Sequence, residues 1–141
     1  MGLISLVYVS FESHPLSNNE LRDILTTARD TNRKINVTGM LLYRDGFFIQ
    51  VLEGEEATVR PLYEKIAKDP RHKNVLTVYV NEVVNRTFSS WSMGFNKITE
   101  DDVKGMEGFT DFLAQPTAEF FTENPSRAAG LLEQFKQRTY F

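Results

Sequence analysis

The sequence contains no cysteine, two histidines and one tryptophan among its 141 residues. Without cysteine the chain can form no disulfide framework, thiolate metal site or cysteine nucleophile, which fits a reducing, cytoplasmic compartment. No apolar run approaches the roughly 20 residues of a membrane-spanning helix, and the N-terminus shows no signal-peptide pattern. The net charge of −3 offers no basic surface to nucleic acid. We therefore expect a globular domain that binds neither membrane nor nucleic acid.

The residues that are present suit one folded domain. Hydrophobic residues make up 41% and charged residues 25% of the chain, close to the average of globular domains. A chain of this length buries roughly two-thirds of its unfolded surface, enough for a core without covalent staples. Its seventeen aromatic rings, eleven of them phenylalanine, are many for this size.

Hydrophobic periodicity predicts two helices and five strands in the first hundred residues. The strands are expected at 3–10, 37–43, 47–53, 74–84 and 93–98, and the helices at 17–32 and 56–68. Ser17 and Glu20 form a capping-box pattern at the start of the first helix. Pro61 would delay or bend the second helix, because proline removes a helical hydrogen bond. Gly46, preceded by aspartate between two apolar runs, indicates a hairpin.

This order, β-α-β-β-α-β-β, is the ferredoxin-like split βαβ arrangement with one extra strand. It predicts an α+β fold with a five-stranded mixed sheet and both helices on one face. Residues 100–141 change character, and the pair Asn124 and Pro125 marks a helix start. We expect one domain over 1–99 and a C-terminal helical extension over 100–141 that covers the other face of the sheet.

Two polar residues interrupt otherwise apolar strands. Gln50 lies within the run 47–52 and Tyr8 within the run 6–9. A buried polar group without a partner costs about 1–3 kcal/mol, so these side chains need partners and would meet if their strands were neighbours. The simpler interpretation is a hydrogen-bonded pair that only fills the core. His14 is expected in a solvated loop, whereas His72, after Arg71, is either solvated or part of an anion site.

Motifs for common enzymes are missing, but several strings together match a known family. They are LVYVS at 6–10, Asn32, NVTGMLLY at 36–43, FFIQVLEG at 47–54, DPRH at 69–72 and WSM at 91–93. In this order and spacing, over residues 3–98, the chain resembles the BLUF family of flavin-binding blue-light sensors. The resemblance implies a ferredoxin-like fold, in agreement with the order of elements derived above.

The resemblance also implies roles for single residues. Tyr8 would donate an electron and a proton to the flavin after light absorption, and Gln50 would switch its hydrogen bonds. Trp91 or Met93 would lie near Gln50 and relay this change to the last strand. The residues expected to bind the cofactor are Tyr8, Ile24, Asn32, Phe48, Gln50, Lys65, Ile66, Asp69, Arg71 and His72. Lys65 stands where arginine is frequent and would meet a phosphate as a point charge.

The function that follows is a short, stand-alone photoreceptor without an attached catalytic domain. It would bind FAD non-covalently, with FMN or riboflavin as alternatives and no metal, and act through a downstream signalling protein and a homo-oligomer. The alternative is a light-independent, ferredoxin-like interaction module whose Tyr8 and Gln50 only fill the core. An RNA-binding version fits the acidic charge poorly, and an acylphosphatase-like enzyme would need an arginine that residues 10–18 lack.

Overall fold

The computed structural model describes residues 2–44, 46–89, 92–97 and 130–132. Its elements are β1 (Leu3–Glu12), α1 (Asn18–Lys34), β2 (Thr38–Arg44), β3 (Phe47–Glu55), α2 (Glu56–Ala67), β4 (His72–Glu82) and β5 (Gly94–Lys97). The predicted order of strands and helices is confirmed, with boundaries shifted by a few residues. Among the described residues, no helix combines the length and apolar character needed to span a membrane.

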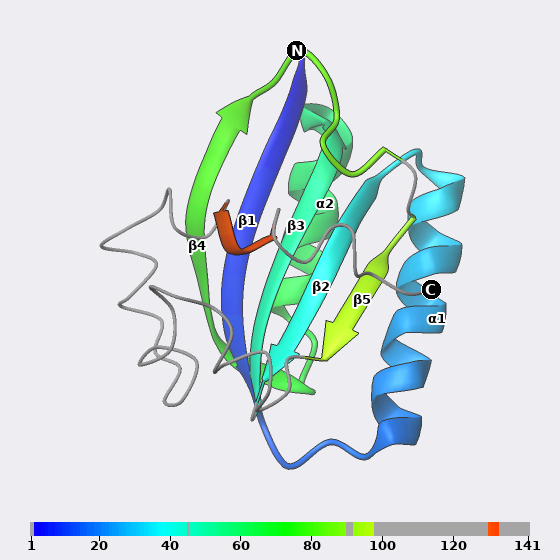
Figure 1. The fold of residues 1–141 in the computed structure, drawn as a ribbon, viewed down its shortest axis with the longest axis vertical. Helices are drawn as coiled ribbons and strands as arrows, with labels where there is room; N and C mark the ends of the chain where they lie inside the picture. The colour runs from blue at the N-terminus through cyan, green and yellow to red at the C-terminus, as the bar shows by residue number, and fades with distance from the viewer. Residues whose placement is uncertain (1, 45, 90–91, 98–129, 133–141) are drawn as a thin grey trace.

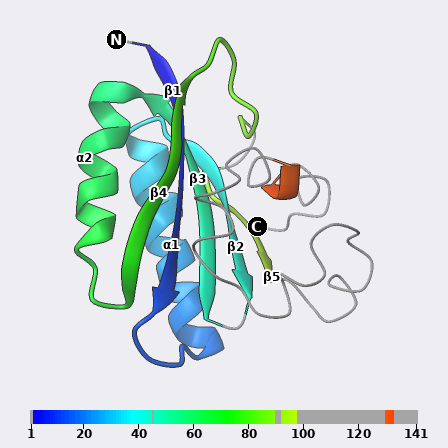
Figure 2. The same cartoon turned by 90° about the vertical axis from the view of Figure 1, so that its left-hand side faces the viewer.

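The five strands form one sheet in the order β4-β1-β3-β2-β5. All neighbouring strands are antiparallel except β2 and β5, which are parallel, so the sheet is mixed as predicted. Figure 1 shows β1 and β3 at the centre of the sheet. In the edge-on view of Figure 2 both helices cover the same face. This is the expected ferredoxin-like arrangement.

The first helix begins where the capping box predicts but ends later. Ser17 Oγ accepts from the N–H of Glu20 at 3.1 Å, and the Ser17 N–H donates to Glu20 Oε1 at 3.1 Å. The helix runs past Asn32 to Lys34, and Asn36 then adopts a left-handed φ of 58°. The polar Asn32 does not end the helix because its side chain is buried and bonded to another segment.

The second helix starts at Glu56, as predicted, so of the two effects expected of Pro61 the late start is excluded. Pro61 lies inside α2, where its ring takes the place of a main-chain N–H donor. The helix ends at Ala67 with Lys68 as its C-cap, just before Asp69 and Pro70, which were predicted to stop it.

Alternation along the strands divides the core into two clusters. The helix-side cluster contains Ile4, Leu6, Tyr8, Leu21, Leu25, Val37, Leu41, Tyr43, Phe48, Leu52, Val59 and Met93. The far-side cluster contains Val7, Val9, Met40, Leu42, Phe47, Ile49, Val51, Phe88, Leu131 and Leu132. A short helical turn at 130–132 therefore packs on the face opposite the helices, as Figure 2 shows. This turn falls within the helix expected after Asn124, and the other residues of the predicted extension lie outside the described residues.

The pairing of β2 with β3 makes a first prediction. Gly39 lies opposite Leu52, and a Cβ at Gly39 would collide with the main-chain carbonyl of Val51. Neither strand can yield without breaking the ladder, so Gly39→Ala should lower the free energy of unfolding by roughly 1–3 kcal/mol or more. Urea denaturation measures this loss. Gly2→Ala, whose added Cβ meets no atom within 4 Å, is the control; equal stability of both variants would contradict the prediction.

Candidate functional site

A cavity of about 230 Å³ lies on the helix side of the sheet. A buried water needs only roughly 10–15 Å³, so this space has the size of a small-molecule site. All ten residues predicted to bind a cofactor line it: Tyr8, Ile24, Asn32, Phe48, Gln50, Lys65, Ile66, Asp69, Arg71 and His72. The structure thus gathers residues that are distant in sequence around one space, while their roles in binding stay predictions.

The inner wall of the cavity holds the two polar strand residues. Tyr8 on β1 and Gln50 on β3 are directly opposite each other in the antiparallel ladder. The Tyr8 hydroxyl donates to Oε1 of Gln50, and both side chains are buried. The expected pairing of the two side chains is therefore present.

Burial sets the protonation state of the phenol. Removal from water raises the pKa of Tyr8 far above its ordinary value, and the nearby Tyr63 and Asp69 raise the pKa further. The Tyr63 ring lies 5.2 Å from the Tyr8 ring, centroid to centroid. Tyr8 therefore stays a neutral hydrogen-bond donor across the physiological pH range.

Gln50 uses its other side-chain atom to reach the segment before β5. Its Nε2 donates to the Sδ of Met93 at 3.3 Å. From α1, Asn32 Nδ2 donates to the Ser92 carbonyl at 2.8 Å and Arg29 Nε to the Met93 carbonyl at 2.9 Å. Met93 lies next to Gln50, as predicted, whereas Trp91 lies outside the described residues. Three side chains thus hold this short segment against the cavity.

Charged groups gather at the other end of the cavity, where α2 meets β4. Arg71 bonds the Asp69 carboxylate through Nη2 at 2.5 Å and through Nε at 3.0 Å. These bonds hold the pKa of Asp69 below its usual range and raise the pKa of Arg71. Both groups stay ionised near neutral pH. With Lys65 one helical turn earlier, they place two cations and one carboxylate at this end.

His72 is fixed within the protein on both ring nitrogens. Nε2 lies 2.6 Å from the carbonyl of Ile66, and Nδ1 lies 2.9 Å from Oγ of Ser10. A carbonyl only accepts, so Nε2 carries a proton and donates to Ile66, while Nδ1 pairs with the Ser10 hydroxyl. His72 therefore contributes its ring to the cavity wall. His14 is exposed and bonds Glu20, as expected for a surface loop, and no group in the described residues is arranged to hold a metal.

Six further residues line the cavity that were not predicted to bind. They are Ser10, Thr27, Ala28, Thr31, Leu41 and Leu62. Helical periodicity contains the signal for most of them. On α1 the lining residues are 24, 27, 28, 31 and 32; on α2 they are 62, 65 and 66, with 69 just beyond its end. Both sets follow the i, i+3, i+4, i+7 spacing of a single helix face. Leu41 is opposite Gln50 on β2, a position that only the strand register reveals.

The chain is similar to known light-responsive proteins. A family model described as sensors of blue-light using FAD matches residues 3–94. The alpha subunit of a photoactivated adenylate cyclase of Euglena gracilis is 36% identical over 120 residues, which is 85% of this chain and 12% of that protein. The beta subunit from Euglena longa is 34% identical over 84% of this chain and 14% of that protein. The chain thus spans only a small part of the length of these curated relatives.

Solved structures agree with this similarity. The photo-activated state of BlsA superposes with a TM-score of 0.75 at 30% identity, covering 92% of this chain and 94% of that one. The dark state of BlrB, a BLUF protein, has a TM-score of 0.79 at 24% identity over 97% of each chain, which is a likeness of fold. BLUF domains bind flavin. Because the family model matches residues 3–94, this chain belongs to the BLUF family of blue-light sensors.

Proposed function

We propose that this protein is a photoreceptor that binds FAD non-covalently and senses blue light through Tyr8 and Gln50. The observation that carries the proposal is the buried chain of hydrogen bonds from Tyr8 through Gln50 to Met93 beside the cavity. Gln50 is its central member, because an amide both donates and accepts and can therefore exchange its bonding partners.

The residues around the cavity fit a flavin. The cavity-lining faces of α1 and α2, which include Ile24 and Ile66, provide two walls for a flat ring. The amides of Asn32 and Gln50 suit the carbonyl and N–H groups at the polar edge of the ring. Lys65 and Arg71 suit the negative charge of a phosphate. This set of donors and walls supports FAD, and it also accommodates FMN.

The flavin, when bound, supplies the absorption of blue light and accepts an electron from the protein. Tyr8 would supply that electron from its neutral phenol, and its proton would follow to the flavin through the Gln50 amide, which would take up the proton at Oε1 and give one up from Nε2. Gln50 then rearranges its amide, which breaks the bond from Nε2 to the Met93 sulfur. A thioether is a weak acceptor, so this bond costs little to break. Release of Met93 is the first change outside the cavity.

In our proposal this change at Met93 is transmitted to another protein molecule, either a signalling partner or a second copy of this chain. The named relatives include adenylate cyclases, in which the similar region is a small part of a longer protein. Ser92 and Met93 lead directly into β5, the edge strand beside β2. Through β5 the change at Gln50 arrives at an edge of the sheet where another protein can respond.

The absorption spectrum tests the proposal. Purified protein should be yellow, and blue light should shift its flavin bands slightly to longer wavelength, because a changed hydrogen bond to a ring carbonyl alters the absorption in a low-dielectric site. The shift should decay in darkness. A preparation reconstituted with FAD that stays colourless, or that binds FAD without any reversible shift, would refute the proposal and favour a light-independent interaction module.

Two substitutions test the roles of the central pair. Tyr8→Phe removes the phenolic proton, and Gln50→Leu removes both amide bonds, so each variant should retain flavin and lose the reversible red shift. Spectra recorded before and after illumination measure this. Tyr79→Phe removes a hydroxyl on the far side of the sheet, where Tyr79 packs against the far-side cluster, and should behave as wild type. A normal light state in both cavity variants would show that neither residue has the proposed role.

The charged end of the cavity generates a prediction about the cofactor. Lys65→Gln should weaken the binding of FMN by a factor of about 2–5, as expected for one partly exposed ion pair of roughly 0.5–1 kcal/mol. Riboflavin, which lacks the phosphate, should bind both proteins equally. Fluorescence titration of the flavin measures both affinities. Lys68→Gln removes the same charge from a lysine outside the cavity lining and is the control; a loss of riboflavin affinity in Lys65→Gln would contradict a phosphate role.

A further inference from the structure

Glu53 is a buried carboxylate that the proposed photochemistry does not use. Its exposed fraction is 1%, and it lies on β3, the strand that also carries Gln50. Positions 50 and 53 face opposite sides of a strand, so Glu53 points to the far side of the sheet. Burying a charge is costly unless hydrogen bonds compensate for it, which makes its partners informative.

The partners of Glu53 are two successive main-chain amides. Oε2 accepts from the N–H of Thr87 at 3.2 Å, and Oε1 accepts from the N–H of Phe88 at 2.8 Å. Arg86 adds bonds from the same loop to the Glu53 carbonyl at 3.0 Å and to Thr38 Oγ1 at 2.9 Å. Charge-assisted bonds to two adjacent amides fix both the position and the orientation of this piece of chain.

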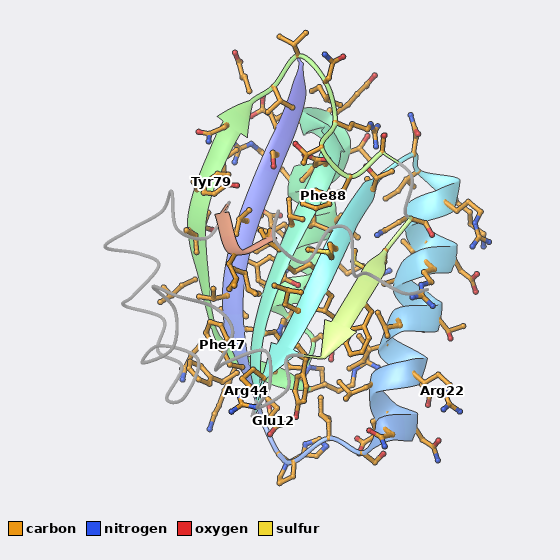
Figure 3. The ribbon with its side chains drawn as sticks, viewed as in Figure 1. Glu12, Arg22, Arg44, Phe47, Tyr79 and Phe88 are labelled. Atoms are coloured by element: carbon orange, nitrogen blue, oxygen red, sulfur yellow. The ribbon has the colours of Figure 1, made fainter. Side chains whose placement is uncertain are left out.

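Two described residues of this part of the chain lie on opposite sides of the sheet. Phe88 belongs to the far-side cluster, together with Leu131 and Leu132. Met93, close to Phe88 in sequence, belongs to the helix-side cluster and bonds Gln50. Figure 3 labels Phe88 over the middle strands of the sheet. Strand β3 thus contacts both residues: Gln50 bonds the Met93 side chain, and Glu53 bonds the Phe88 main chain.

We propose that Glu53 is a positioning residue for the light signal. It anchors Thr87 and Phe88 to β3. Because of this anchor, the release of Met93 alters how Phe88 packs against Leu131 and Leu132. The inference rests on the proposed function. A loop without this anchor would absorb a displacement of Met93 in its own main chain. With the amides fixed, the displacement acts on the Phe88 ring and on the residues packed against it.

Hydrogen exchange of the flavin-loaded protein, followed by NMR in darkness and under blue light, tests the inference. In wild type the Leu131 and Leu132 amides should exchange at different rates in the two states. Glu53→Gln, which can offer only one oxygen to two donors, should keep the red shift and lose this difference. It should also speed exchange at Thr87 and Phe88 by about tenfold, as expected for a lost charge-assisted bond. Glu55→Gln removes an exposed charge from the same strand and should behave as wild type.

Two outcomes would overturn the inference: no light-dependent exchange at Leu131 and Leu132 in wild type, or the full difference in Glu53→Gln. A second variant covers the case in which Glu53→Gln does not fold. Phe88→Leu keeps an apolar side chain and removes the ring, so it should retain the red shift and lose the difference at Leu131 and Leu132. Absence of the red shift in wild type is a separate result, because it refutes the proposed function and is seen in the spectrum alone.

Discussion

The hydrogen bond between the Tyr8 hydroxyl and Gln50 Oε1 is the interaction around which the site is organised. Two polar side chains at the centre of a sheet would cost about 1–3 kcal/mol each if they were unpaired. Their direct opposition in the β1–β3 ladder removes this cost, and it places both groups on the cavity. A one-residue slip of the ladder would send one side chain to the far side, so the register is a condition for the site as well as for the fold.

The surroundings of this pair keep it neutral and movable. Burial holds Tyr8 as a phenol, so its proton is available to an acceptor at any physiological pH. Gln50 binds a phenol on one side and a thioether on the other, and the second bond is weak. In the proposed function the amide is held strongly enough to have one orientation and loosely enough to change it. Asn32 and Arg29 bond the main-chain carbonyls of Ser92 and Met93, so this segment is joined to α1 as well as to Gln50.

The sequence was sufficient to predict most of the fold and many cavity residues, because both depend on periodicity. The capping box at Ser17 and the hairpin at Gly46 are local signals, and the structure contains both features. Asn32 was misleading as the end of α1, because the carbonyl of Ser92, distant in sequence, satisfies its side chain. No local pattern reports such a partner. Leu41 was missed for the same reason, since its position opposite Gln50 follows only from strand pairing.

Glu53 shows what sequence reading leaves out. Within the string FFIQVLEG it matched a family pattern, and nothing in the string indicates that its carboxylate would bind the amides of Thr87 and Phe88. A buried carboxylate with two main-chain donors tolerates little displacement, because each lost bond leaves charge desolvated. A side chain that resists movement, beside an amide able to reorient on the same strand, provides a fixed point against which a small change can act. In the function proposed above, a fixed Glu53 and a Gln50 amide that reorients would be complementary requirements of one sensor.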